Sequence, residues 1–166
     1  MYFPLPAPSN DIQCRLPDIP LPPYRYVPGI FPHPTKNEKG HSFHKETLET
    51  QGQQMCFTDD VGWLRGLDLF DQRFYWEAHE VWEERWKQLR GPEKSLLQGM
   101  ILAAACLLQR HMGREKIAAR SWQKAKRLLK CSMQEVENIG IDMDRFIEEM
   151  DREVPIGGWP QIRNSD

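Results

Sequence analysis

The stretch EKSLLQGMILAAACLLQRHM, Glu93 to Met112, is the part of the sequence that decides the fold. It is apolar nearly all round, whereas a helix at a protein surface carries only one apolar stripe. Its longest continuous apolar run, Met100 to Leu108, has nine residues, about half of the ~20 that are needed to cross a bilayer. The stretch therefore predicts the central, buried helix of a bundle and argues against a membrane protein.

Helical periodicity continues on both sides of this stretch. It predicts four further helices, in residues 59–72, 73–89, 114–132 and 143–154. Thr58 or Asp59 is the expected N-cap of the first of them. Gly91 and Pro92 end the second and start the central helix, with proline where its missing amide costs least. No segment has the alternation of a strand, so the predicted fold class is all-α, a small bundle of about five helices.

Residues 1–58 differ in composition from the rest of the chain. Ten of the thirteen prolines lie in the first 34 residues, and each fixes φ and removes an amide donor, which excludes a regular helix or a central strand. The same segment carries aromatic residues, Ile30 and three histidines, which a solvated linker does not need. We expect residues 1–58 to be an extended arm lying on a helical domain at residues 59–153, followed by a tail at residues 154–166.

The bulk composition is that of an ordinary globular protein. A net charge of -2 with 40% hydrophobic and 28% charged residues shows no bias toward nucleic acid or membrane. The four cysteines are widely spaced and form no Cys-x-x-Cys pair. The amino terminus, MYFPLPAPSN, lacks the basic start and the apolar run of a secretory signal. These features favour a cytoplasmic protein with reduced cysteines.

The predicted helix at residues 73–89 contains the stretch YWEAHEVWEERW, Tyr75 to Trp86. At about 100° per residue its apolar side holds Phe74, Tyr75, Ala78, Val81, Trp82 and Leu89, and its polar side holds Glu77, Glu80, Glu84 and Lys87. His79 and Glu83 are four residues apart and occupy the boundary between the two sides. A histidine and a carboxylate at this spacing can ligate one metal ion or share one proton.

Three uses of the His79 and Glu83 pair stay open. The pair can form only a structural hydrogen bond, it can bind a divalent metal such as zinc, iron or manganese, or it can serve acid/base chemistry or ligand binding without metal. A metal site needs further ligands, for which the candidates are His33, His41 and His44 in the arm and Glu80 on the same helix. The stretch is not the zinc-protease motif H-E-x-x-H, because Glu83 stands where the second histidine would come.

Two stretches together carry a family resemblance: LFDQRFYWEAHEVWEERW and LLQGMILAAACLLQRHMGREKIAARSWQKAKRLL. They contain an aromatic-Glu-Ala-His-Glu-x-x-Glu helix, a Leu-Gln-Gly at residues 97–99 and a glycine followed by an alanine-containing helix. With these features, residues 67–129 resemble the bacterial, archaeal and plastid family known as domain of unknown function 309. The resemblance implies a small all-helical fold and no particular activity. It directs attention to Glu77, His79, Glu80, Glu83 and Gln98, with His33 and His41 in the arm.

Gln98 and Trp76 are the residues that we expect to contact a ligand or cofactor. Gln98 enters an otherwise apolar helix, where an unpaired amide costs about 1–3 kcal/mol. Its expected partner is Glu80 or Glu83, and the alternative is exposure to solvent in the first turn or so. Trp76 points away from the main apolar face, so it needs a cover, which the arm, a partner subunit or a ligand can supply.

The predicted helix at residues 114–132 has a strongly basic side. Its buried side contains Ile117, Ala118, Ser121, Trp122, Ala125, Leu128 and Leu129, and its basic side contains Lys116, Arg120, Lys124, Lys126, Arg127 and Lys130. Such a strip can meet the phosphates of a nucleic acid. No recognition motif accompanies it, so a solvated or self-paired face is the favoured interpretation.

Three functional hypotheses follow from the sequence. The first is a binding domain whose cleft around His79, Glu80, Glu83 and Gln98, partly roofed by the arm, holds a small ligand, a metal or a partner segment. The second is an enzyme for hydrolysis or proton transfer, with Glu80 or Glu83 as base and His79 as proton shuttle or ligand. The third and least favoured is a nucleic-acid-associated protein that uses the basic helix. A homodimer stays open, and no membrane partner is expected.

Overall fold

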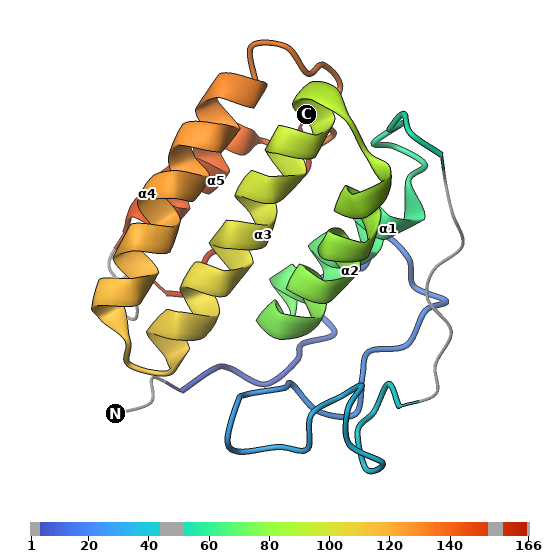
Figure 1. Ribbon diagram of the computed structural model, residues 1–166, viewed down its shortest axis with the longest axis vertical. Coiled ribbons are helices and arrows are strands. Elements are labelled where there is room, and N and C mark those ends of the chain that lie inside the picture. Colours follow the sequence, from blue (N-terminus) through green and yellow to red (C-terminus); the bar gives the residue numbers. More distant parts are fainter. Residues whose placement is uncertain (1–3, 44–51, 153–157, 166) are drawn as a thin grey trace.

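The computed structural model describes residues 4–43, 52–152 and 158–165. Within them the chain forms five helices and no strand (Figure 1). The helices are α1 (Val61–Asp71), α2 (Tyr75–Gln88), α3 (Gly91–His111), α4 (Glu115–Ser132) and α5 (Met143–Asp151). The predicted all-α bundle is confirmed, and each predicted helix is present within a few residues of its expected bounds.

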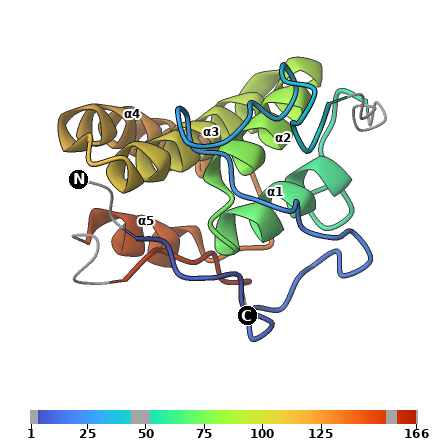
Figure 2. The same ribbon diagram turned by 90° about the horizontal axis from the view of Figure 1, so that it is seen from below.

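The helix α3 lies between two neighbours, as its apolar circumference predicts. It packs against α2 on one side and α4 on the other, and α1 packs against α2. Figure 2 shows two layers, with α2, α3 and α4 in one and α1 and α5 in the other. The helices α1 to α4, which follow one another in the sequence, are therefore also neighbours in space.

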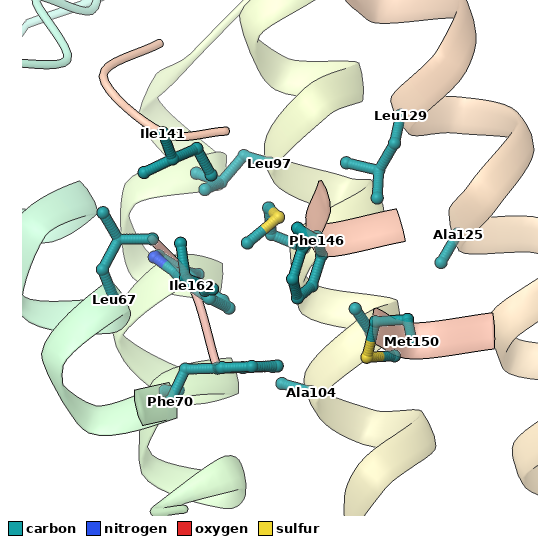
Figure 3. Packing of buried hydrophobic residues seen from close by; sticks show 14 of the residues in the cluster. Leu67, Phe70, Leu97, Ala104, Ala125, Leu129, Ile141, Phe146, Met150 and Ile162 are labelled. Atoms are coloured by element: carbon teal, nitrogen blue, oxygen red, sulfur yellow. The ribbon is translucent and has the colours of Figure 1, made fainter. Parts of the chain in front are cut away.

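The hydrophobic core lies between the two layers (Figure 3). Side chains from four helices and from two loop segments face one another there: Leu67, Phe70, Leu97, Ala104, Ala125, Leu129, Ile141, Phe146, Met150 and Ile162. Each of them is 6% exposed or less. Because burying one large apolar side chain contributes roughly 1.5–3 kcal/mol, this cluster is the main source of the stability of the bundle.

Two glycines allow the helices to approach each other closely. A Cβ at Gly66 of α1 would overlap the indole ring of Trp82 in α2. A Cβ at Gly99 of α3 would lie 2.7 Å from the Leu129 side chain of α4. Glycine weakens a helix interior, so at these two positions close packing is the reason for its presence.

The N-cap of α1 is neither of the two predicted residues. Asp60, and not Thr58 or Asp59, accepts a hydrogen bond from the Trp63 backbone N–H at 2.8 Å. The same carboxylate accepts from Nε of Arg85 in α2 at 2.6 Å, and both side chains of this ion pair are 3% exposed or less. Asp60 is the cap because it satisfies the helix terminus and a buried guanidinium together.

The basic side of α4 is exposed in large part. Lys116, Arg120, Lys124, Arg127 and Lys130 are exposed, whereas Lys126 forms an ion pair with Asp151 of α5. Ile117 was expected to be buried and is 50% exposed, so that prediction was wrong. The nucleic-acid hypothesis stays a prediction.

Residues 4–43, called the N-terminal segment below, contain no helix or strand and pass along α1 and α2 (Figure 2). Both carboxylate oxygens of Asp68 in α1 accept backbone N–H donors, from Arg15 and Leu16, at 2.8 Å each. Arg65 of α1 donates to the carbonyl oxygens of Ile19 and Pro20 at 3.0 and 2.6 Å. These bonds bury the polar side of α1 as well as its apolar side.

The predicted boundaries at residues 58 and 153 stay predictions, and residues 153–157 lie outside the described part of the chain. Among the described residues, none of the helices has the length and apolar character that a bilayer crossing requires.

Candidate metal centre and adjoining pocket

The helix α2 carries the predicted site residues at the border of its buried face. Tyr75 and Trp82 are 2% and 0% exposed and anchor the helix in the core. His79, Glu80 and Glu83 are each half-buried. The helix therefore fixes the position of these three side chains while solvent still reaches them.

Ligand atoms of His79, Glu80 and Glu83 converge. One atom from each residue lies within 4.8 Å of the other two. Atoms bound to one metal ion at about 2.1 Å lie up to about 4.2 Å apart, so small rotations of the side chains close the set around an ion. Helical periodicity placed Glu80 on the solvent side of α2, whereas in the structure its carboxylate turns toward His79. We refer to these three residues as the α2 cluster.

The charges of the α2 cluster suit a cation. Nδ1 of His79 is buried and makes no hydrogen bond within the described residues, and Oε1 of Glu80 lies 3.3 Å from it. The adjoining His79 imidazole lowers the pKa of the Glu80 carboxyl below its ordinary value, against the opposing effect of burial. Metal ligation requires an ionised carboxylate and a ring nitrogen without a proton, so a bound ion would replace the proton between His79 and Glu80.

Glu77 is buried, although the periodicity of α2 predicted that it faces solvent. It is 4% exposed, its Oε1 accepts from the Tyr26 backbone N–H at 2.7 Å, and Nε2 of His41 lies 3.0 Å from the same oxygen. Both partners belong to the N-terminal segment, so α2 alone could not reveal this burial. Its other oxygen, Oε2, is buried without a hydrogen-bond partner in the described part of the chain.

The histidines that precede the helices do not join the α2 cluster. Both ring nitrogens of His41 are engaged, Nε2 with Glu77 and Nδ1 with the Ser42 hydroxyl at 2.8 Å. In His33, Nδ1 accepts from the backbone N–H groups two and three residues further along the chain, each at 3.3 Å. His44 lies outside the described residues. The role of His33 and His41 as metal ligands stays a prediction that this geometry does not support.

Trp76 is covered by the N-terminal segment. The Tyr26 and His33 rings meet its indole edge to face, with ring centroids 4.9 and 5.3 Å away. Of the three covers considered for Trp76, the chain itself therefore supplies one. The homodimer hypothesis stays a prediction.

Gln98 is half-buried near the start of α3. Neither of its side-chain polar atoms is among the buried atoms that lack a partner in the described residues. The hydrogen bonds of those residues include none between Gln98 and Glu80 or Glu83. The Gln98 amide is therefore hydrated by solvent, which was the alternative to pairing with a glutamate. Gln98 is not part of the α2 cluster.

A pocket of about 440 Å³ adjoins the α2 cluster and shares Glu80 with it. The N-terminal segment forms one wall with residues 19–22, and α2 forms another with Trp76 and Val81. The carboxylates of Glu77 and Glu84 also line it. A volume of this size suits a small molecule, so the structure places a ligand-sized space beside the candidate metal ligands.

Comparison with known families identifies part of the chain. Residues 63–121 match the family model described as Domain of unknown function (DUF309). The match includes α2 and α3 with parts of α1 and α4, and it contains the α2 cluster. The family resemblance predicted from the sequence is confirmed. Comparisons with the curated proteins and with the solved structures gave no match.

Proposed function

We propose that this chain, whose residues 63–121 match the model of the domain of unknown function 309 family, binds a divalent metal ion with His79, Glu80 and Glu83. The observation that carries the proposal is the convergence of the three ligand atoms within 4.8 Å of one another. One imidazole and two carboxylates are suitable ligands for zinc, iron(II) or manganese. All three side chains project from one helix, so the set is present without any rearrangement of the backbone.

The second part of the proposal is that the metal ion serves a small ligand. Three protein ligands leave at least one coordination position open to water or to another molecule. Glu80 lines the pocket of about 440 Å³, so a molecule in the pocket can reach that position. The proposed function is therefore binding of a small ligand next to a metal ion, beneath the N-terminal segment.

Calorimetric titration of the purified, chelator-treated protein with Zn²⁺ and with Mn²⁺ tests the first part. The wild type should bind one equivalent of at least one of these ions. His79→Ala and Glu83→Gln should each weaken that binding about tenfold or more, because each removes one of three ligands.

The matched control for this titration is Glu84→Gln. Glu84 lies next to Glu83 on α2, but its carboxylate pairs with Lys87 at 2.7 Å and is not part of the α2 cluster. This variant should bind metal like the wild type. A wild-type protein that binds neither ion, or equal affinities in all four proteins, would remove the proposal.

A metal-dependent enzyme is the second candidate function, and the pocket beside the α2 cluster favours it. A metal ion bound by the α2 cluster would lower the pKa of a water molecule at its open position and so supply a nucleophile next to the pocket. The metal-loaded wild type would then hydrolyse an activated ester such as 4-nitrophenyl acetate, and Glu80→Gln would not. Equal rates for the two proteins would leave binding alone as the function of the site.

A further inference from the structure

Arg73, between α1 and α2, has a backbone conformation that favours glycine. Its φ is 64°, in the left-handed region that residues with a Cβ rarely adopt. The reason is the way α1 ends: the Arg73 N–H donates to the Phe70 carbonyl and the Phe74 N–H to the Leu69 carbonyl, both at 2.8 Å. This is the Schellman arrangement, whose left-handed position is usually glycine.

The end of α3 provides a comparison within the same chain. There the Gly113 N–H donates to the Arg110 carbonyl and the Arg114 N–H to the Gln109 carbonyl, both at 2.9 Å. Gly113, with a φ of 70°, occupies the position that Arg73 occupies after α1. One helix thus ends with the residue that the turn favours and the other with an arginine. A disfavoured backbone conformation of this kind suggests that the side chain has a use of its own.

The Arg73 side chain is buried without a counter-ion. The residue is 8% exposed, and its Nη1 donates to the Asp71 backbone carbonyl at 2.6 Å. Its Nε is buried and has no hydrogen-bond partner, and no carboxylate forms an ion pair with the guanidinium, within the described residues. A guanidinium cannot lose its proton at ordinary pH. Burying its charge is therefore costly unless an anion approaches it.

The side chain of Asp71, whose backbone carbonyl Arg73 contacts, is already engaged elsewhere. Asp71 accepts the Ile162 backbone N–H at 2.6 Å with one oxygen and pairs through the other with Arg15 at 2.9 Å. Burial raises the pKa of the Asp71 carboxyl to about 6, against the lowering effect of Arg15. This carboxylate is thus committed to its own partners, and the charge on Arg73 remains for another anion.

Arg73 lines a pocket that is large enough for such an anion. The pocket is about 670 Å³ and lies between residues 6–15 and residues 161–164, two stretches that run side by side in Figure 2. Arg15 and Arg163 line it together with Arg73, and its two acidic residues are Asp71 and Asp11. The Asp11 carboxylate accepts from the Ser9 hydroxyl at 3.2 Å. Three guanidinium groups at one pocket favour a ligand that carries an oxyanion.

We infer that this second pocket binds a small molecule through a carboxylate or phosphate group, with Arg73 as the cation that holds it. The planar guanidinium pairs with either group through two parallel hydrogen bonds. Arg73 is the central group because it is the buried cation of the pocket that has no carboxylate partner. The site is separate from the α2 cluster and does not depend on a metal ion.

Titration of the full-length protein with inorganic phosphate and, separately, with malonate tests this inference. Ionic strength is kept constant with sodium chloride, and both the melting temperature and the dissociation constant are measured. At least one of the two probes should bind and raise the melting temperature of the wild type. Binding of phosphate alone identifies a phosphate ligand, and binding of malonate alone identifies a carboxylate ligand.

The decisive variant is Arg73→Gly, because glycine fits the backbone conformation and the variant is expected to fold. It should lose at least about tenfold in affinity for the probe, as expected when a charge-assisted pair is removed. Arg73→Lys keeps the charge without the forked geometry and should give an intermediate loss. Arg120→Gln removes one positive charge from the exposed side of α4 and should bind like the wild type. The inference is overturned if neither probe binds at concentrations up to about 10 mM, roughly the weakest dissociation constant expected of a specific site. It is also overturned if Arg73→Gly binds the probe as tightly as the wild type.

Discussion

Asp60 combines two roles that the sequence does not reveal together. Thr58, Asp59 and Asp60 stand in a row, and each has a side-chain oxygen that can accept from a helix N–H. Only the third lies beside the buried guanidinium of Arg85. The choice among the three depends on a residue twenty-five positions along the chain, so local sequence could identify the region of the cap but not the residue.

Asp60→Ala should be among the most destabilising substitutions in the chain. It removes the cap of α1 and leaves Arg85 buried without its carboxylate, and breaking a buried ion pair costs about 3–5 kcal/mol. Asp59→Ala is the matched control, because Asp59 is exposed and such changes usually stay within about 0.5 kcal/mol. Equilibrium unfolding in urea measures both. Similar losses for the two variants would mean that the ion pair with Arg85 does not stabilise the fold.

The candidate site was predictable only where one helix contains it. The spacing of His79 and Glu83 placed them at the boundary of α2, and the structure brings Glu80 to the same place. The burial of Glu77 was not predictable, because its partners Tyr26 and His41 are 51 and 36 residues away. Periodicity describes how a helix faces its own core, and it contains no information about an irregular segment that later covers the other face.

The contact between α1 and α2 depends on the absence of a side chain. Gly66→Ala should destabilise the protein by about 1–3 kcal/mol, as overpacking commonly does, although alanine favours a helix by about 1 kcal/mol over glycine. The reason is that the added methyl group overlaps the Trp82 indole, which also donates to the Trp63 carbonyl at 3.2 Å.

Gly62→Ala on the same helix is the control for the Gly66 substitution. There the added methyl group would meet Arg85 side-chain atoms at 3.2 to 3.4 Å, a contact that small shifts relieve. Urea unfolding of the two variants should show the smaller loss at Gly62. A Gly66→Ala protein as stable as the wild type would mean that α1 and α2 can separate without cost.

The helices themselves were predictable because their signals are local. Gly91 and Pro92 mark the start of α3 in both sequence and structure, and Asp142 is the N-cap of α5, accepting from the Arg145 N–H at 3.0 Å. The order of packing was less visible, since an apolar surface shows that a helix is buried and not which neighbour buries it. The glycines at residues 66 and 99 mark where two helices approach each other closely. Helix propensity counts glycine only as a weak helix former, so it does not reveal this packing role.

For the molecule as a whole, the N-terminal segment should contribute to stability. A protein that lacks residues 1–43 loses the backbone donors of Asp68 and Glu77 and the carbonyl acceptors of Arg65, and each buried polar group left unpaired costs about 1–3 kcal/mol. Residues 52–58 are kept, because Phe57 is 5% exposed and part of the core. The melting temperature of the truncated protein, followed by circular dichroism, should fall clearly below that of the full chain.

A substitution in the intact chain separates the effect of the contacts between the N-terminal segment and α1 from the effect of shortening the chain. Asp68→Asn weakens the charge-assisted bonds to the Arg15 and Leu16 N–H groups without removing any residue, and Asp144→Asn on the exposed side of α5 is its control. The first should lower the melting temperature and the second should not. An unchanged melting temperature in both the truncated protein and Asp68→Asn would show that residues 1–43 do not rest on the helices in solution.

The hydrogen bonds that join the two ends of the described chain have a consequence for the order of folding. The Trp159 indole N–H donates to the Pro4 carbonyl at 3.1 Å, and Nε of Arg15 donates to the Asn164 side chain at 3.2 Å, over separations of 155 and 149 residues. Contacts between successive helices close short loops and form early. Contacts between residues so far apart in the sequence form only after the intervening chain has folded. The rate of refolding should therefore depend on the packing of the helices. The contacts between the two ends should form last during refolding and break first during unfolding.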